Sequence, residues 1–188
     1  TRSSIRYRGF TLIELLVTLA IVAIVAVIAA PSLQNFVLNN RIRSQTAALT
    51  SSLAFARTEA ITRSTRVVTC PLTTSVACGC GVDTDIDKEK WESGWQVFVD
   101  TDNDDICDSN DSLLEVHGPL DGSETTLRGS DDVRSKVTFI YDGSAQPGTF
   151  VLCDQRGWGS DARAIEVLAT GRTRNLIATK SSQTSCNP

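Results

Sequence analysis

An uninterrupted apolar block lies near the start of the chain. Residues 10–30 carry a single charge, Glu14, and thirteen of these 21 residues are Leu, Ile, Val or Phe. A helix of this length spans roughly 30 Å, the thickness of a bilayer core. The apolar side chains together outweigh the cost of one carboxylate in hydrocarbon. The block therefore predicts a membrane-inserted helix, and the basic residues before it mark its cytoplasmic side.

Two simpler interpretations of the apolar block are a secretory signal and a plain membrane anchor. A secretory signal has a shorter apolar core, no carboxylate and a small-residue cleavage site. A plain anchor explains the hydrophobicity but not Glu14, because an ionisable group inside a membrane segment indicates a function.

Beyond residue 30 the pattern becomes amphipathic. The apolar residues that recur on one helical face are Leu49, Leu53, Ala56 and Ala60. Their spacing of four, three and four residues is that of a helix with one buried side. We expect a single helix from about Thr11 to Arg63, whose second half, residues 31–64, packs on a globular head.

The remaining residues, 65–188, predict a β-rich head. The expected strands are Arg66–Cys70, Trp95–Asp100, Leu113–Val116, Lys136–Tyr141, Phe150–Cys153, Ala164–Ala169 and Thr173–Ala178. Alternation is clearest at Val137, Phe139 and Tyr141, which would share one sheet face. Clusters of Gly, Pro, Asp and Ser separate the segments. A long N-terminal helix followed by an antiparallel sheet predicts the α+β class.

Charge is distributed unevenly along the 188 residues. The net charge is −4 and the sequence pI is about 5.0, which argues against a generally basic nucleic-acid binder. Residues 83–132 hold 16 acids against three bases, whereas residues 133–188 hold seven bases against four acids. The composition, 41% hydrophobic and 21% charged, is that of a folded domain with an added apolar element.

The residues Gly9-Phe10-Thr11-Leu12-Ile13-Glu14 resemble a type IV prepilin signal, in which a basic leader ending in Gly precedes Phe and, further on, Glu. The resemblance implies that a prepilin peptidase removes residues 1–9 and that Phe10 becomes N-methylated. It also implies that Glu14 neutralises the new N-terminus of a neighbouring subunit in a filament. A carboxylate in hydrocarbon is tolerable when it meets a cation there.

Three further markers in the sequence, the third made of two segments, resemble the GspH/FimT group of minor pilins and minor pseudopilins. They are residues 54–60, residues 94–100, and the pair 152–157 and 171–174. The resemblance implies the pilin fold and a subunit of a type IV pilus or a type II secretion pseudopilus, anchored in the bacterial inner membrane with a periplasmic head. It implies other pilins or pseudopilins and the inner-membrane assembly platform as partners, and no cofactor.

Six cysteines follow the apolar block, and their even number fits a disulfide framework in an oxidising compartment. We expect Cys153 to pair with Cys186 and tie down the C-terminal tail, and Cys70 to pair with Cys107. The alternative is a zinc site made from Cys78, Cys80, Cys107 and His117. Its C-x-C spacing departs from the usual C-x-x-C of such sites.

Asp100, Asp102 and Asp104 resemble the first half of an EF-hand loop, with Asp111 at its twelfth position. Asp105 occupies the sixth position, where that loop needs Gly. A solvated hairpin loop uses the same residue types. The sequence therefore leaves two interpretations open: the three aspartates bind calcium, or the segment is an ordinary hairpin loop.

The segment Gly171-Arg172-Thr173-Arg174 places two arginines two residues apart, on one face of a strand. In FimT-type pilins such arginines resemble a site that binds double-stranded DNA for natural transformation, and Lys180 lies nearby. The alternative is a solvated strand face. Phosphate contacts of this kind carry no sequence information.

No arrangement typical of an enzyme is visible in the sequence. The sole histidine, His117, sits in a turn sequence before Gly and Pro. The chain has no nucleophile motif, phosphate loop or paired carboxylates in an apolar pocket. We expect a structural subunit, with DNA capture through Arg172 and Arg174 as the alternative.

Overall fold

The computed structural model describes residues 10–72, 90–105, 107–108, 110–122, 124–159, 161–178 and 186. The chain divides into two compact units, Thr1–Asn39 and Asn40–Pro188. The long helix α1, Leu12–Arg63, contributes to both units. Its bounds confirm the predicted helix to within one residue.

One face of α1 is buried within the second unit. Leu49, Leu53, Ala56 and Ala60 are each fully buried, as their helical spacing predicts. The helix ends where Ser64 takes a left-handed conformation with φ of 52°. Thr65 N then bonds back to Ala60 O at 3.2 Å, so a carbonyl of the last turn remains paired.

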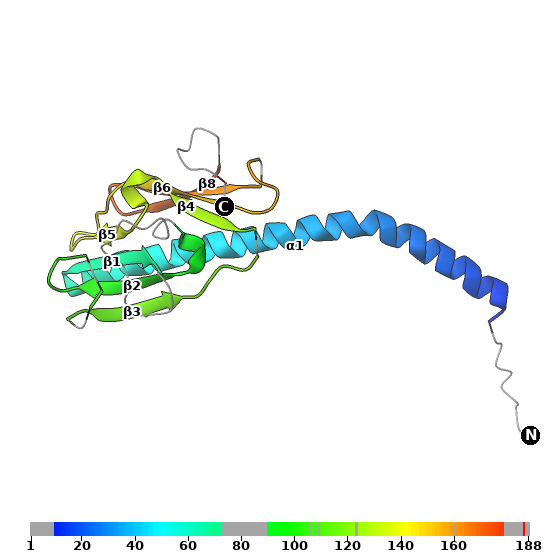
Figure 1. Cartoon of the computed structure of the whole chain (residues 1–188), viewed down its shortest axis with the longest axis horizontal. Helices are drawn as coiled ribbons and strands as arrows, with labels where there is room; N and C mark the ends of the chain where they lie inside the picture. The colour runs from blue at the N-terminus through cyan, green and yellow to red at the C-terminus, as the bar shows by residue number, and fades with distance from the viewer. Residues whose placement is uncertain are drawn as a thin grey trace, which may run out of the picture. The chain divides into compact units, whose positions relative to one another are not determined.

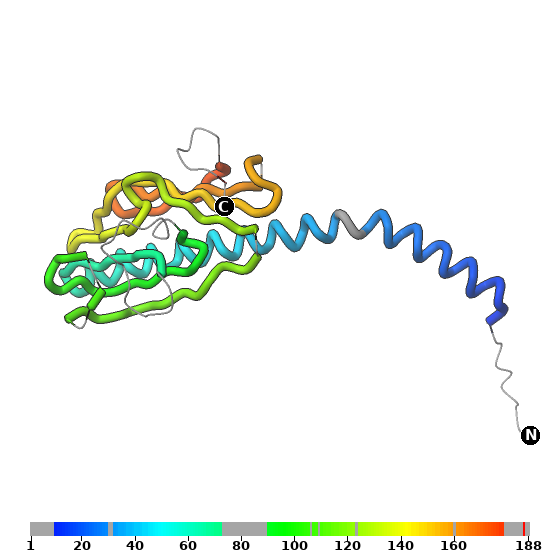
Figure 2. The backbone as a smooth tube through the Cα atoms, in the orientation of Figure 1, coloured from blue at the N-terminus to red at the C-terminus, as the bar shows by residue number. Residues whose placement is uncertain are grey.

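In the part of the chain that the structure describes, two antiparallel sheets of four strands each follow the helix (Figure 1). In the first sheet the order is β3 (Ser112–His117), β2 (Trp95–Asp100), β1 (Arg66–Pro71) and β5 (Val137–Phe139). In the second sheet it is β4 (Thr126–Gly129), β6 (Gly148–Cys153), β7 (Arg163–Val167) and β8 (Thr173–Ile177). The backbone trace shows the chain reversing its direction between β2 and β3, which pair antiparallel (Figure 2). Two 3-10 helices, η2 (Trp91–Ser93) and η3 (Asp131–Val133), complete the described elements.

Helix and sheets share one hydrophobic core. The buried face of α1 packs with residues of both sheets, among them Val97 and Phe139 from the first and Phe150 from the second. Trp91 lies edge-on to Phe150, with ring centroids 4.7 Å apart, and its Nε1 donates to Arg134 O at 2.8 Å. A buried tryptophan thus keeps its N–H satisfied while its ring joins the core.

All seven predicted strands are present, and β4 is an addition. Val137 and Phe139 are both fully buried in the hydrophobic core, as their predicted shared face requires, but burial does not alternate along β5 because Thr138 between them is buried as well. The prediction for Tyr141 was wrong, because β5 ends at Phe139 and the Tyr141 side chain lies in the following turn, 66% exposed.

Candidate functional site

The first residues of α1 form a capping box. Glu14 N donates to Thr11 Oγ1 at 3.3 Å, and Thr11 N donates to Glu14 Oε2 at 3.4 Å. This reciprocal pair satisfies two N–H groups that a helix start would leave unpaired. It also places a negative charge at the positive end of the helix dipole. The predicted cleavage residue Gly9 lies outside the described residues, and Phe10, which follows it, is 84% exposed.

The apolar side chains that follow Glu14 are unburied within the chain. Every large apolar residue from Leu12 to Ile28 is at least 50% exposed. Among the described residues, α1 is the one helix long and apolar enough to cross a membrane. Soluble monomers rarely expose an apolar surface of this extent. The segment therefore calls for an apolar environment, such as a bilayer or neighbouring helices.

Two residues of the sequence motifs, Arg57 and Gly171, meet at the turn that contains Gly143. Gly171 has φ of +70°, and a Cβ there would lie 1.9 Å from Gly143 O. Arg57 Nε donates to the same carbonyl at 3.0 Å. Gly143 has φ of +79°, and its own Cβ would meet the Ile61 side chain at 2.6 Å. The contact holds α1, the turn after β5 and the β7–β8 turn together.

The two arginines of the last motif lie in different settings. Arg174 is on β8, opposite Glu166 of β7, and its Nε donates to Glu166 Oε2 at 2.9 Å. Arg172 is exposed and directly precedes the strand, so the two do not both lie within β8 as predicted. Lys180 lies outside the described residues. The Arg174 charge is partly neutralised by its neighbour, whereas the Arg172 side chain faces solvent.

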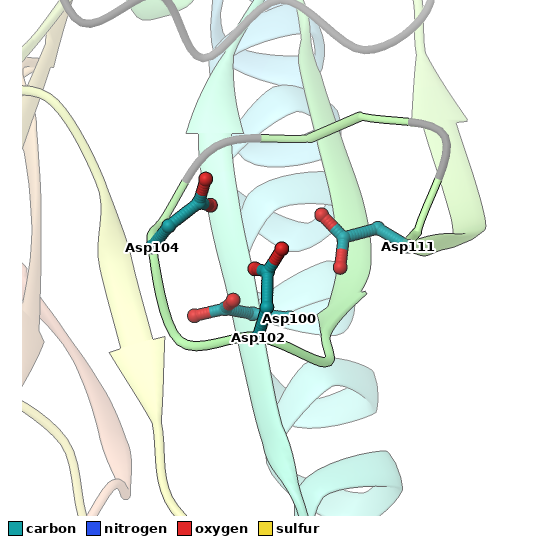
Figure 3. A group of neighbouring side chains, drawn as sticks. All are labelled: Asp100, Asp102, Asp104 and Asp111. Carbon is teal, nitrogen blue, oxygen red and sulfur yellow. The ribbon is translucent and has the colours of Figure 1, made fainter.

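The β2–β3 hairpin brings four aspartates together at its loop (Figure 3). They are Asp100, Asp102, Asp104 and Asp111, and one carboxylate oxygen from each lies within 4.8 Å of the others. Asp105, at the position where the EF-hand loop needs Gly, adopts φ of 63°. Asp can occupy this left-handed region, so the missing glycine does not prevent the turn.

Asp105 is held by two cations and stands apart from this cluster. It pairs with Arg66, and its Oδ2 lies 2.6 Å from Lys136 Nζ. Burial alone would raise the pKa of Asp105, but the bonds and charges of Lys136 and Arg66 outweigh it and lower that pKa. Burial dominates at Asp100 and raises its pKa, although Arg66 Nε lies 3.1 Å from Asp100 Oδ2.

A disulfide joins Cys153 of β6 to Cys186, closing 33 residues of sequence separation. Cys70 and Cys107 are each disulfide-bonded and lie in one buried cluster with Val68 and Phe98. Within the part of the chain that the structure describes, however, no bond joins Cys70 to Cys107. Their predicted pairing with each other thus has no support there.

The zinc alternative is not supported by its described members. Cys107 is committed to a disulfide, so it cannot supply a thiolate. The His117 ring stacks on Trp95 with centroids 4.0 Å apart, and its Nδ1 lies 2.8 Å from Gly118 O. The other two members, Cys78 and Cys80, lie outside the described residues.

A buried ion pair that sequence reasoning missed lies in the β6–β7 loop. Arg156 donates from Nη2 to Asp154 Oδ2 at 2.6 Å, and its Nη1 lies 3.2 Å from Asp161 Oδ1. Burial alone would raise the pKa of Asp154, but its bonds with Arg156 outweigh it and lower the pKa. The spacing Asp-x-Arg next to a glycine turn is the signal that could have indicated the pair.

Comparison with known proteins agrees with this architecture. Crystal structures of the Pseudomonas aeruginosa type IV minor pilin FimU, in space groups P21 and P65, resemble this chain with TM-scores of 0.57 and 0.54. The first is 20% identical and covers 79% of this chain and 96% of FimU. The Vibrio cholerae minor pseudopilin EpsH, of the Type 2 Secretion System, resembles it with a TM-score of 0.51 at 11% identity, over 73% of this chain and 97% of EpsH. No curated protein sequence matches the chain significantly.

The long apolar helix and the antiparallel sheets define a pilin-like protein. Residues 5–30 match the prokaryotic N-terminal methylation motif, in agreement with the prepilin-like segment. Residues 45–171, more than half of the chain, match the family described as Type II transport protein GspH. The chain belongs to that family.

Proposed function

We propose that this protein is a minor pilin or pseudopilin that is built into, or primes, the tip of a type IV pilus or a type II secretion pseudopilus. The observation that carries the proposal is the combination at the start of α1. An exposed apolar helix long enough to span a membrane begins with Glu14 in a capping box. Residues 1–9 would be the leader and residues 10–30 the membrane and filament-core segment. Residues 31–64 would be the amphipathic second half of the helix, and residues 65–188 would form a periplasmic head.

Glu14 would set the register between neighbouring subunits. Removal of the leader gives Phe10 a positively charged amine, and a carboxylate in hydrocarbon is tolerated when it meets such a cation. The capping bond to Thr11 uses Oε2. Oε1 can then accept a hydrogen bond from the ammonium group of an adjacent subunit, while the capping bond at the start of α1 is kept.

Leader removal is tested on the protein purified after coexpression with a prepilin peptidase. Mass spectrometry of the N-terminal peptide is expected to find Phe10 as the first residue, carrying a methyl group. An N-terminal peptide that still includes Gly9 under these conditions would contradict the assignment of residues 1–9 as a leader.

The filament role is tested by replacing Glu14 with Gln in the full chain. We expect Glu14→Gln to enter the inner membrane normally but to be lost from isolated filaments, because the charge that meets the neighbour's amine is gone. Glu59→Gln is the matched control, since Glu59 is the other carboxylate of α1 and pairs locally with Arg63. Recovery of Glu14→Gln in filaments at the control level would refute the role.

DNA capture through Arg172 and Arg174 is the second candidate function. Exposure of Arg172 beside the edge strand β8 favours it, whereas the pairing of Arg174 with Glu166 opposes it. Two phosphate contacts would give a slope of about −1.8 in a plot of log affinity against log salt. Binding of the detergent-solubilised chain to duplex DNA should then vanish in Arg172→Ala plus Arg174→Ala and persist in the exposed-arginine control Arg43→Ala. Absence of binding by the unsubstituted chain at low salt would exclude this function.

A further inference from the structure

Each of the two sheets has an edge strand whose outer side is open. The strand β3 ends the first sheet and β8 ends the second, and no other described segment of the chain pairs with either of them on its outer side. Both edges carry exposed apolar side chains, which are Leu113, Val116, Leu176 and Ile177. An open edge of this kind is a template on which another strand can add.

The outer side of β8 presents backbone hydrogen-bonding groups. Arg172 O accepts a hydrogen bond of 2.9 Å from Leu168 N, and Ala178 N donates to Ala162 O at 3.1 Å, so the even-numbered positions of this segment bond to the β7 side. In an antiparallel pair, alternate residues direct these groups to opposite sides. The N–H and C=O groups at positions 173, 175 and 177 therefore point away from β7.

The two edges are protected to different degrees. Edge strands commonly carry proline, charge or a bulge, which discourage pairing with other chains. The strand β8 has no proline, and its one charged residue, Arg174, is paired with Glu166 of β7. The strand β3 has a register shift opposite Val97 and Phe98, which limits continuous pairing along β3 to a few residues.

The two edges lie on opposite sides of α1. Ser52 Oγ donates to Glu115 Oε1 of β3 at 2.5 Å, and Thr50 Oγ1 donates to Asn175 Oδ1 of β8 at 3.1 Å. Helical residues two positions apart point about 200° apart around the axis. Figure 1 agrees, with β3 and β8 at opposite margins of the head. A second copy beside the head can therefore bring its β3 edge to the β8 edge of the first.

Both edge strands run antiparallel to α1. The strand β8 starts after Gly171, beside Arg57, and then reaches Thr50. The strand β3 starts at the loop near Arg66, which follows the helix, and then reaches Ser52. The first residues of both strands thus lie level with the C-terminal end of α1. Two copies in the same orientation would place β3 and β8 parallel, with these ends side by side.

Opposite charges lie at these two strand ends. Asp102, Asp108 and Asp111 belong to the loop before β3, and no cation of the described residues pairs with any of the three. Arg172 directly precedes β8, is exposed and has no acidic partner in the part of the chain that the structure describes. The acidic loop of one copy would lie level with Arg172 of the next, which favours this pairing and its register.

We propose that β3 of one copy pairs in parallel with β8 of a second copy of this chain, with the acidic loop of the first contacting Arg172 of the second. Each copy uses a different edge on each side, so the contact is heterologous and can repeat along a series of subunits. Two short strands bury less surface than a stable interface needs, so the contact acts between copies that one membrane or filament already holds together. Their shared orientation rests on the proposed membrane insertion.

The test uses the full chain reconstituted in lipid vesicles, as an equimolar mixture of 15N-labelled and unlabelled copies. We expect Ile177→p-benzoylphenylalanine to cross-link to a peptide that contains β3, with labelled–unlabelled pairs showing that two copies are joined. The same photoreactive residue at Asp132, an exposed position on neither edge, is the control and should not capture that peptide.

Three cross-linking results would overturn the proposal. They are capture of a peptide outside the β2–β3 hairpin, a cross-link confined to one copy, which would show that the edge is covered within the chain, and no cross-link at all. Flotation of the vesicles verifies insertion separately. A missing cross-link in floated protein would therefore count against the strand contact and leave the membrane role standing.

Charge reversal tests the alignment of the two edges. Asp102→Arg alone and Arg172→Glu alone should each lower the cross-link yield about fivefold, because like charges then face each other. The chain with both substitutions, and an equimolar mixture of the two single variants, should regain the yield. Asp132→Arg is the matched control and should keep it. Equal yields in all variants, or no recovery on combining the two reversals, would also overturn the proposal.

Discussion

Gly171→Ala provides the strictest test of how the head is held together. The new Cβ would lie 1.9 Å from Gly143 O, far closer than two such atoms can approach. The carbonyl it meets is also the acceptor of the 3.0 Å bond from Arg57. The turn cannot give way without disturbing this bond, so the substitution acts on α1 and on both neighbouring turns together.

The expected loss is the sum of a backbone and a packing contribution. An alanine at φ of +70° costs about 1 kcal/mol once the lower entropy of the unfolded chain is counted. Overpacking and the weakened Arg57 bond add about 2 kcal/mol. We therefore expect the free energy of unfolding to fall by about 3 kcal/mol. For a chain of this size the corresponding drop in Tm is about 6–12 °C.

Two other glycines separate these contributions. Gly157 has φ of +67° and a Cβ there would meet nothing within 4 Å, so Gly157→Ala should cost only about 1 kcal/mol. Gly159 has equally open space and lies outside the left-handed region, so Gly159→Ala should change stability by at most about 0.5 kcal/mol. Chemical unfolding of the three variants in detergent measures the series. Equal losses at Gly171 and Gly157 would refute the contact with Gly143.

Three other predictions concern the stability of the head. Cys186→Ser should lower the free energy of unfolding by about 3–4 kcal/mol, because the bond to Cys153 closes 33 residues, and the difference should vanish when both chains are unfolded in dithiothreitol. Arg57→Leu should cost about 1–2 kcal/mol through the bond to Gly143 O, whereas Arg43→Leu should be nearly neutral in the same denaturant titration. The pKa of Asp154 is lowered in the folded chain, so the ionised carboxylate stabilises the fold above about pH 4, and this stabilisation is lost as the pH falls through the pKa of the folded chain. Asp154→Asn should therefore be less stable than the unsubstituted chain at pH 7. The difference in the free energy of unfolding should close in unfolding curves taken towards pH 3.

The helix and most strands could be predicted because their patterns are local. Burial at four helical positions follows directly from apolar spacing, and the β2 strand has the bounds that its residues predict. The strand β4 was missed because its four residues include Arg128 and Gly129 and show no alternation. Its position depends on pairing with β6, which is a tertiary interaction that no local pattern contains.

The functional regions were predictable to different degrees. Glu14 could be singled out as a candidate from the sequence alone, because a carboxylate in a long apolar block is conspicuous, and its role in a filament stays a prediction. The Arg174–Glu166 pair could not, since it depends on the register between β7 and β8. The loop acids Asp100, Asp102 and Asp104 were predicted as ligands, with Asp111 at the twelfth position of the loop, and the β2–β3 hairpin brings all four carboxylates together.

The motif that places Arg172 beside Gly171 combines two separable properties. Gly171 and Arg57 serve the fold, because both act on the Gly143 carbonyl. Arg172 lies outside this contact and is exposed, so its removal leaves the turn intact. A DNA-uptake defect caused by a Gly171 substitution would therefore show only that the head had been destabilised. Loss of uptake in Arg172→Ala, with an unchanged Tm and normal filaments, is the result that would assign DNA capture to this surface.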